Sequence, residues 1–149
     1  MRVISGGQTG VDQIALEVAQ ELGLETGGWM PKGFMTESGV RPDMAVRFGM
    51  LESDSANYPK RTELNVADAS VTILLNKDMG PGSRLTQRLC RKHAKPCLRN
   101  PSPDTDLSEY KVVNFAGTRG SRLSAAEKDE FRSVIRALLE PLAPERIAL

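Results

Sequence analysis

The stretch Ser5-Gly6-Gly7-Gln8-Thr9-Gly10-Val11-Asp12 decides the fold of this chain, because it joins a short β-branched segment to an amphipathic helix. Val3-Ile4 precedes the stretch, apolar residues recur at helical spacing over residues 11–22, and Gly23 follows as a stop signal. A strand, a glycine-rich turn and a helix in this order are typical of α/β proteins. The glycines allow a close approach of the main chain, and the helix N-terminus attracts anions.

The stretch matches neither of the common phosphate-binding loops. It lacks the Gly-x-Gly-x-x-Gly spacing of dinucleotide folds and the Gly-Lys-Ser/Thr ending of P-loops. Two interpretations therefore stay open, a site for an anion or nucleotide-like ligand and a tight turn without a ligand. We favour the ligand site, because two adjacent glycines are more than a plain turn needs. Its candidate residues are Gly6, Gly7, Gln8, Thr9, Gly10 and Asp12.

Composition predicts one globular domain over residues 1–149, with 40% hydrophobic and 26% charged residues. The net charge of +1 gives no overall attraction to nucleic acid or to an anionic membrane. No apolar run approaches the roughly 20 residues of a membrane-spanning helix, and no apolar signal-peptide region is present. We therefore expect a cytoplasmic protein that binds neither nucleic acid nor membrane.

Cysteine and histidine residues give no indication of a metal site. The spacing of Cys90 and Cys97 is not that of a zinc pair, and His93 is the sole histidine. We expect two reduced, buried cysteines and a surface histidine near a helix C-terminus.

The remaining pattern predicts a three-layer α/β fold with a mainly parallel central sheet. The nearly continuous apolar run Val71–Leu75 is typical of a central parallel strand that is covered on both faces. Further strands are expected over residues 24–29, 95–99 and 111–116. Helices are expected over residues 59–67, after the N-cap candidate Ser83, and after the capping box of Ser124 and Glu127.

Residues 34–58 show no sustained period and predict a long irregular segment. Such a segment is uncommon inside a compact domain and is often a binding loop or a contact between subunits. We therefore expect it to pack on something, and a neighbouring subunit is one candidate.

Two further glycine-rich turns, residues 76–83 and 117–122, also lie between a strand and a helix. Because the carboxyl ends of parallel strands meet at one edge of a sheet, all three turns should line one cleft for an anionic small molecule. Trp29 is interpreted either as a stacking wall or as a core edge, and Lys32 either as an anion ligand or as a solvated lysine. The other candidates are Gly82, Ser83, Arg84, Thr86, Arg119 and Ser121.

Five stretches of the chain resemble the putative molybdenum carrier family, the circularly permuted branch of the Rossmann-like SLOG superfamily. The most specific are Gly6-Gly7-Gln8-Thr9-Gly10 and Gly27-Gly28-Trp29-Met30-Pro31-Lys32-Gly33. The others are residues 61–68, Gly82-Ser83-Arg84-Leu85-Thr86 with the following helix to Cys97, and residues 114–119. The resemblance covers nearly the whole chain in order.

This resemblance implies a Rossmann-like binding protein for the molybdenum cofactor, a pterin with a dithiolene-held metal and a terminal phosphate, or for molybdate. It also implies a homodimer or homotetramer that delivers its cargo to molybdenum enzymes. A nucleotide is the alternative ligand, bound by a sensor or by an N-glycosidase of the phosphoribohydrolase type. In that enzyme Asp12 would act with Arg84 or Arg119. The residues favour binding over catalysis, because no Ser/His/Asp set and no metal cluster is present.

Overall fold

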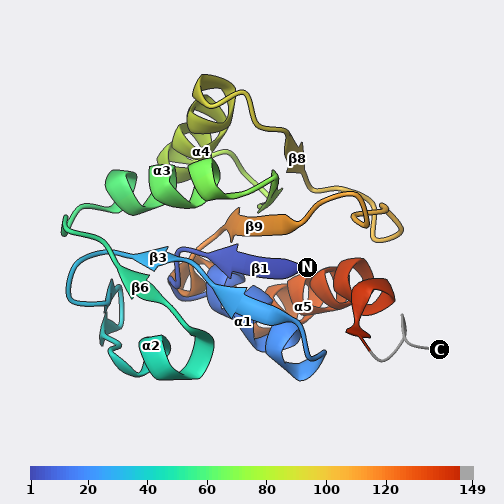
Figure 1. Ribbon diagram of the computed structural model, residues 1–149, viewed down its shortest axis with the longest axis horizontal. Helices are drawn as coiled ribbons and strands as arrows, with labels where there is room; N and C mark the ends of the chain where they lie inside the picture. The colour runs from blue at the N-terminus through green and yellow to red at the C-terminus, as the bar shows by residue number, and fades with distance from the viewer. Residues whose placement is uncertain (145–149) are drawn as a thin grey trace.

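Five parallel strands form the central sheet, and helices cover both of its faces (Figure 1). The computed structural model describes residues 1–144. Neighbouring strands are parallel throughout the sheet, so the mainly parallel sheet predicted from the sequence is entirely parallel. The order across the sheet is β2 (Glu25–Gly27), β1 (Arg2–Ser5), β9 (Val112–Gly117), β7 (Val71–Leu75) and β8 (Cys97–Arg99).

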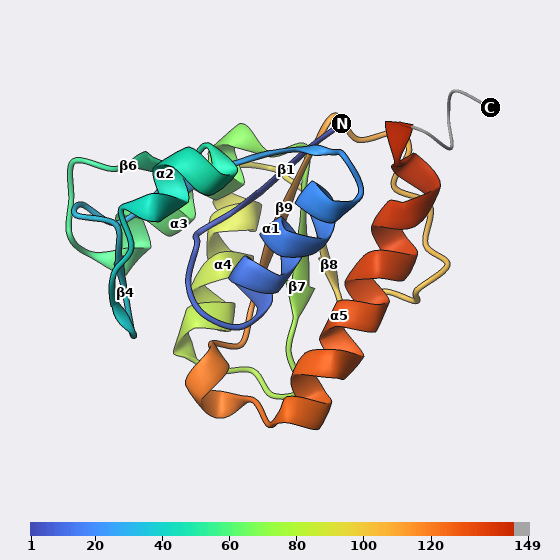
Figure 2. The ribbon, with the colours of Figure 1, turned by 90° about the horizontal axis from the view of Figure 1, so that it is seen from below.

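Two helices pack on each face of the sheet, which confirms the predicted three-layer fold (Figure 2). On one face, α1 (Val11–Glu21) and α5 (Ala125–Leu139) pack on each other and enclose the largest apolar cluster. On the other face lie α3 (Tyr58–Asp68) and α4 (Pro81–Lys92), with a smaller cluster beneath them. Among residues 1–144, no helix has both the length and the apolar character needed to cross a bilayer.

Strand β7 is interior, as its apolar run predicts, and all five of its residues are buried. The middle position of the sheet belongs to β9, which pairs with β1 on one side and β7 on the other. Along β9, Val113 and Phe115 belong to the large apolar cluster, whereas Asn114 belongs to neither apolar cluster. A strand buried on both faces therefore carries one polar side chain in its centre.

The strand predicted over residues 24–29 is divided at Gly28. Gly28 has φ 122°, and a Cβ there would lie 2.2 Å from the Ser5 carbonyl oxygen, so only glycine fits this approach. The chain then leaves the main sheet, and β3 (Trp29–Met30) pairs with β6 (Leu51–Glu52). The side chain of Asn65 holds this turn by bonding both the amide and the carbonyl of Trp29.

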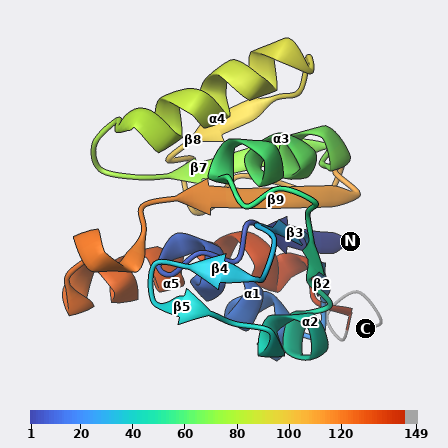
Figure 3. The same ribbon diagram turned by 90° about the vertical axis from the view of Figure 1, so that its left-hand side faces the viewer.

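The segment over residues 34–58 is more regular than its sequence predicts (Figure 3). It contains the hairpin of β4 (Met35–Thr36) and β5 (Gly39–Val40), helix α2 (Asp43–Phe48) and strand β6. Three of its residues, Met44, Phe48 and Met50, form an apolar cluster with Leu16 and Met30. The inner side of the segment therefore packs on its own subunit.

Two predicted helix starts have different outcomes. The capping box before α5 is confirmed, because Ser124 and Glu127 bond each other's backbone amides at 3.0 and 3.1 Å. Helix α4 begins earlier than predicted, at Pro81 with Gly80 as its N-cap. Ser83 lies inside the first turn, where its hydroxyl accepts from the Asn76 amide at 2.8 Å. The short 3-10 turns η1 (Gly120–Arg122) and η2 (Glu140–Leu142) flank α5.

A candidate anion-binding cleft at the carboxyl edge of the sheet

A cleft of about 520 Å³ opens at the carboxyl ends of β1, β7 and β9. All three glycine-rich turns contribute to its wall, through Gly6 and Gln8, through residues 77–83, and through residues 117–119. Figure 3 shows the turn before α4 and the orange turn after β9 at the same edge of the sheet. The helix after β1 covers one face and the helix after β7 covers the other, which makes this edge a topological switch point, where ligands bind in α/β sheets.

The deepest part of the cleft holds a buried ion pair between Asp12 and Arg61. Asp12 lies in the first turn of α1, and Arg61 reaches it from α3, with Nη1 3.4 Å from Oδ2. The guanidinium also lies over the ring of Tyr58, 5.1 Å from its centroid. A Cβ at Gly6 would lie 1.7 Å from Arg61 Nη1. A glycine at position 6 is therefore what allows the arginine to reach the carboxylate.

The environment of Asp12 raises the pKa of its carboxyl group towards neutral pH. Burial raises the pKa of Asp12 from 3.8 to about 6, although Arg61 and the backbone amide of Gln8 favour the ionised form. The Gln8 amide donates to Oδ2 at 3.1 Å. At pH 7 the carboxylate is mostly ionised, and a small change in local charge can protonate it.

Two buried polar atoms in the wall of the cleft have no hydrogen-bond partner within residues 1–144. They are Nε of Arg61 and Oδ1 of Asn114. The other amide atom of Asn114 donates to the Thr72 hydroxyl at 3.2 Å. Because buried polar groups are nearly always bonded, an unsatisfied donor and an unsatisfied acceptor in one cleft favour a polar ligand there.

The N-terminus of α4 supplies further donors. Its N-cap, Gly80, offers no side chain, and Pro81 follows at the first helical position. In the part of the chain that the structure describes, the backbone amides of Gly82 and Ser83 have no acceptor, and both residues line the cleft. Thr86 also lines it and donates its hydroxyl to the Gly82 carbonyl at 3.1 Å. Unpaired amides at a helix N-terminus are suited to an anion.

The rim of the cleft is basic. Arg119 and Arg122 are exposed, line the cleft and form no salt bridge with any residue among 1–144. Lys77 also lines the cleft, and its ammonium group lies 3.3 Å from the carboxylate of Glu127. The two arginines are therefore the cations best placed to neutralise an incoming anion.

The backbone amides of the first glycine loop are bonded within the protein. The Gly7 amide donates to the Ser5 hydroxyl, the Gln8 amide to Asp12, and the Thr9 amide to the Gln8 side chain. A Cβ at Gly10 would lie 2.4 Å from the Thr118 carbonyl oxygen, so this glycine allows the first and third turns to approach each other. Gly7, Thr9 and Gly10 do not line the cleft, whereas Gly6, Gln8 and Asp12 do.

Thr9 and Ser121 hold a carboxylate of the protein itself. The Thr9 hydroxyl donates to Glu37, and the amide and hydroxyl of Ser121 donate to the same carboxylate at 2.9 and 2.8 Å. Burial disfavours the ionised form of Glu37, but these hydrogen bonds outweigh it and hold the pKa of that carboxyl below its usual range. The hairpin that carries Glu37 is thereby fastened to the first and third turns.

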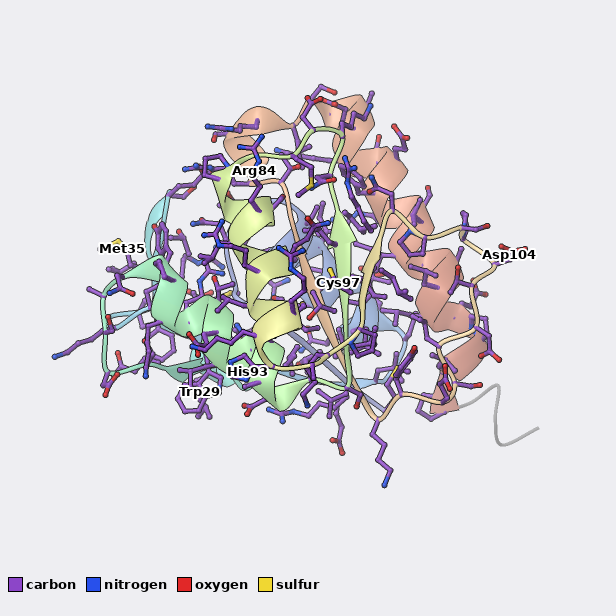
Figure 4. All side chains as sticks on the ribbon, turned by 90° about the horizontal axis from the view of Figure 1, so that it is seen from above. Trp29, Met35, Arg84, His93, Cys97 and Asp104 are labelled. Carbon is purple, nitrogen blue, oxygen red and sulfur yellow. The ribbon has the colours of Figure 1, made fainter. Side chains whose placement is uncertain are left out.

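Three further candidates lie outside the cleft: Trp29, Lys32 and Arg84. Figure 4 shows Trp29 and Arg84 at opposite ends of the layer formed by α3 and α4. The indole of Trp29 is half-buried and donates to Asp68 at 2.9 Å, as expected for a core edge, while Lys32 and Arg84 are exposed. In the alternative pair for catalysis, the partner of Asp12 is Arg61 rather than Arg84 or Arg119.

Among the cleft residues that sequence reasoning missed are Arg61 and Asn114. The signal for Asn114 was available, because a polar residue in the middle of an apolar strand is unusual unless it has a function. Nothing in the spacing of α3 indicates that Arg61 reaches Asp12, since the two lie 49 positions apart.

Cysteine and histidine residues do not form a metal centre among residues 1–144, where no three metal-binding side chains gather. Both cysteines are free thiols. Cys90 is buried as predicted, but Cys97 is only half-buried, because it lies in the first position of the edge strand β8. The ring of His93 is half-buried and bonds Glu63 at 3.1 Å.

Comparison with known proteins agrees with this architecture. The sequence profile of the circularly permutated YpsA SLOG family matches residues 3–139. A crystal structure of a putative molybdenum carrier protein from Syntrophus aciditrophicus SB is similar, with 32% sequence identity and a TM-score of 0.71. The similarity covers 93% of this chain and 92% of that one. A search of curated proteins gave no match. With its profile match spanning most of the chain and its fold shared with that structure, the protein belongs to the circularly permutated YpsA SLOG family.

Proposed function

We propose that the protein binds and carries an anionic, phosphate-bearing small molecule, and that its cargo is the molybdenum cofactor. One observation carries the proposal: the Gly82 and Ser83 amides, which have no acceptor among residues 1–144, lie in the wall of the same cleft as Arg119 and Arg122. Helix dipole, amide donors and guanidinium groups all favour a phosphate or another oxyanion. The name of the solved relative supports the choice of cargo.

The chemistry of the cleft fits this cofactor. A volume of about 520 Å³ is in the range of small-molecule sites. The α4 N-terminus with Arg119 would hold the terminal phosphate, and the polar residues Arg61 and Asn114 also line the cleft. The metal would be held by the dithiolene of its own cargo molecule. Molybdate, a small oxyanion, would use the same donors as the phosphate.

The main test compares Arg119, which lines the cleft, with Arg84, which does not. A charge-assisted bond from arginine to phosphate is worth about 1.5–3 kcal/mol in a partly wet cleft. We expect Arg119→Ala to weaken an anionic ligand by roughly ten- to a hundredfold. Arg84→Ala is the matched control, because Arg84 is exposed and lies outside the cleft.

The measurement is calorimetric titration of each variant with molybdenum cofactor, molybdate and adenosine monophosphate. The proposal predicts that the cofactor binds most tightly and that Arg119→Ala alone weakens it. Equal affinities in the wild type and both variants would place the site elsewhere.

An N-glycosidase acting on nucleoside monophosphates is the second candidate. It is favoured by the carboxyl group of Asp12, which lies in the cleft beside Arg61 with a pKa near neutral pH. Steady release of free base from the monophosphate, lost in Asp12→Asn, would establish this activity. Tight binding of a nucleotide without turnover would instead indicate a nucleotide sensor.

A further inference from the structure

The two cysteines of the chain lie in contact on the α4 side of the sheet. Cys90 is on the inner side of α4, and Cys97 packs against the same apolar cluster from β8. Both side chains therefore meet in the packing between α4 and the sheet. Cys90 is 1% exposed and Cys97 is half-buried, so solvent reaches the pair through Cys97, which Figure 4 shows beside α4.

A line of polar side chains joins this pair to the cleft. In the sheet register, Thr72 is the partner of Cys97 on one side and of Asn114 on the other, so the three side chains lie on one face. The Thr72 hydroxyl accepts from the Asn114 amide at 3.2 Å. Asn114 in turn lines the cleft.

We propose that Cys90 and Cys97 form a reversible dithiol–disulfide site whose oxidation alters the cleft wall through Thr72 and Asn114. The oxidant is a low-molecular-weight disulfide. This inference is independent of the ligand proposed above, because the thiol pair and the polar line exist without one.

The pair is prepared for thiol–disulfide exchange. The neighbouring Cys97 thiol lowers the pKa of Cys90 to about 7, and the neighbouring Cys90 raises the pKa of Cys97. One negative charge is therefore shared by the two sulfurs near neutral pH. Passage of the Cys97 proton to Cys90 places the thiolate on the sulfur that an external disulfide can reach.

The reaction then proceeds in two balanced steps. The Cys97 thiolate attacks the external disulfide, forms a mixed disulfide and releases one thiolate, which takes the proton of Cys90. The Cys90 sulfur attacks the sulfur of Cys97 and expels the second thiolate, which takes a proton from water. Two protein thiols are oxidised and one external disulfide is reduced to two thiols. Closing the bond pulls on Cys97, the register neighbour of Thr72.

Trypsin makes the product simple to detect. It cleaves after Arg88, Arg91 and Lys92, whereas Lys95 is protected by Pro96, so Cys90 and Cys97 fall in the separate peptides 89–91 and 93–99. After the folded protein is treated with oxidised glutathione, we expect these two peptides to be linked and both thiols to be lost together. In Cys97→Ser no linked peptide can form, and the buried Cys90 should stay unreacted.

A second readout follows the side-chain amide of Asn114 by nitrogen-15 NMR, assigned from its absence in Asn114→Ser. Its signal should shift on oxidation of the wild type, stay unchanged in treated Cys97→Ser, and return after reduction. Linkage found only in denatured protein, a mixed disulfide at Cys97 as the sole product, or linkage without a shift of Asn114 would each overturn the proposal.

Discussion

At the scale of single residues, the ion pair of Asp12 and Arg61 shows how burial and pairing compete. The side chains are 7% and 12% exposed, so both groups have lost most of their water. A single contact with Arg61 at 3.4 Å does not fully offset the free-energy cost of removing the Asp12 carboxylate from water. The pKa of Asp12 therefore rises to about 6. An anion bound to Arg61 would weaken the stabilisation that Arg61 gives to the ionised carboxylate of Asp12.

The raised pKa of Asp12 has a defined effect on stability. Below pH 3.8 the folded and unfolded chains both carry the proton, and between about pH 4 and 6 the unfolded chain ionises first, so stability falls as the pH rises. Asp12→Asn cannot ionise. The free energy of unfolding of the wild type, minus that of Asp12→Asn, should fall by about 2 kcal/mol from pH 4 to pH 7.

Urea unfolding at each pH measures this difference, in which titrations common to both proteins cancel. A difference that stays constant or rises over this range would contradict the environment assigned to Asp12.

At the scale of secondary-structure elements, two junctions of the same type have different properties. Both α1 and α4 follow a parallel strand and a glycine-rich turn. In the first junction Asp12 and Ser5 accept from the loop amides, so the protein provides its own acceptors. In the second junction the cap is Gly80, and no side chain of the described residues bonds the amides of the first turn.

This contrast predicts a loss of binding when one amide of α4 is removed. Gly82→Pro deletes the donor at a position in the first helical turn, where proline is tolerated. Gly82→Ala keeps the donor, and its Cβ would have no atom within 4 Å. We expect molybdate affinity to fall about tenfold in the proline variant and to be unchanged in the alanine variant, by calorimetry.

Circular dichroism should show the same helix content in both variants. Equal molybdate affinities in the two would mean that this amide does not contact the anion.

The elements predicted from the sequence are those with a strong local pattern. The apolar run of β7 and the capping box of α5 specify their structures locally. Strands β3 to β6 have two residues each, and their pairing depends on partners elsewhere in the chain, so no periodicity reveals them. Helix α2 is likewise too short, at six residues, to show a period.

At the scale of the whole molecule, strand order explains which parts of the cleft were predictable. Turns that follow parallel strands must meet at one edge, and this places Gly82 and Arg119 in one wall. Arg61 comes from α3, which precedes its strand, and reaches the cleft only because α3 packs against α4. The hydrogen bonds from Thr9 and Ser121 to the Glu37 carboxylate likewise form only because a hairpin distant in the sequence folds beside these turns.

The surface of residues 34–58 leads to a prediction about assembly. Although the segment packs on its own subunit, it exposes the apolar side chains Met35, Val40, Val46, Leu51 and Tyr58, with Val46 92% exposed. Exposed apolar residues clustered in one segment favour a protein contact. Size-exclusion chromatography with light scattering should return a dimer or tetramer mass, and Val46→Glu should lower it. A wild-type monomer at micromolar concentration would refute this prediction.

The most direct test of the anion-binding cleft is a crystal structure with molybdate, in which anomalous scattering locates the molybdenum. We predict one dominant peak in the cleft, with oxyanion oxygens within hydrogen-bond distance of the Gly82 and Ser83 amides and facing Arg119. A dominant peak at any other surface, or an empty cleft at a molybdate concentration that saturates the calorimetric signal, would contradict the account.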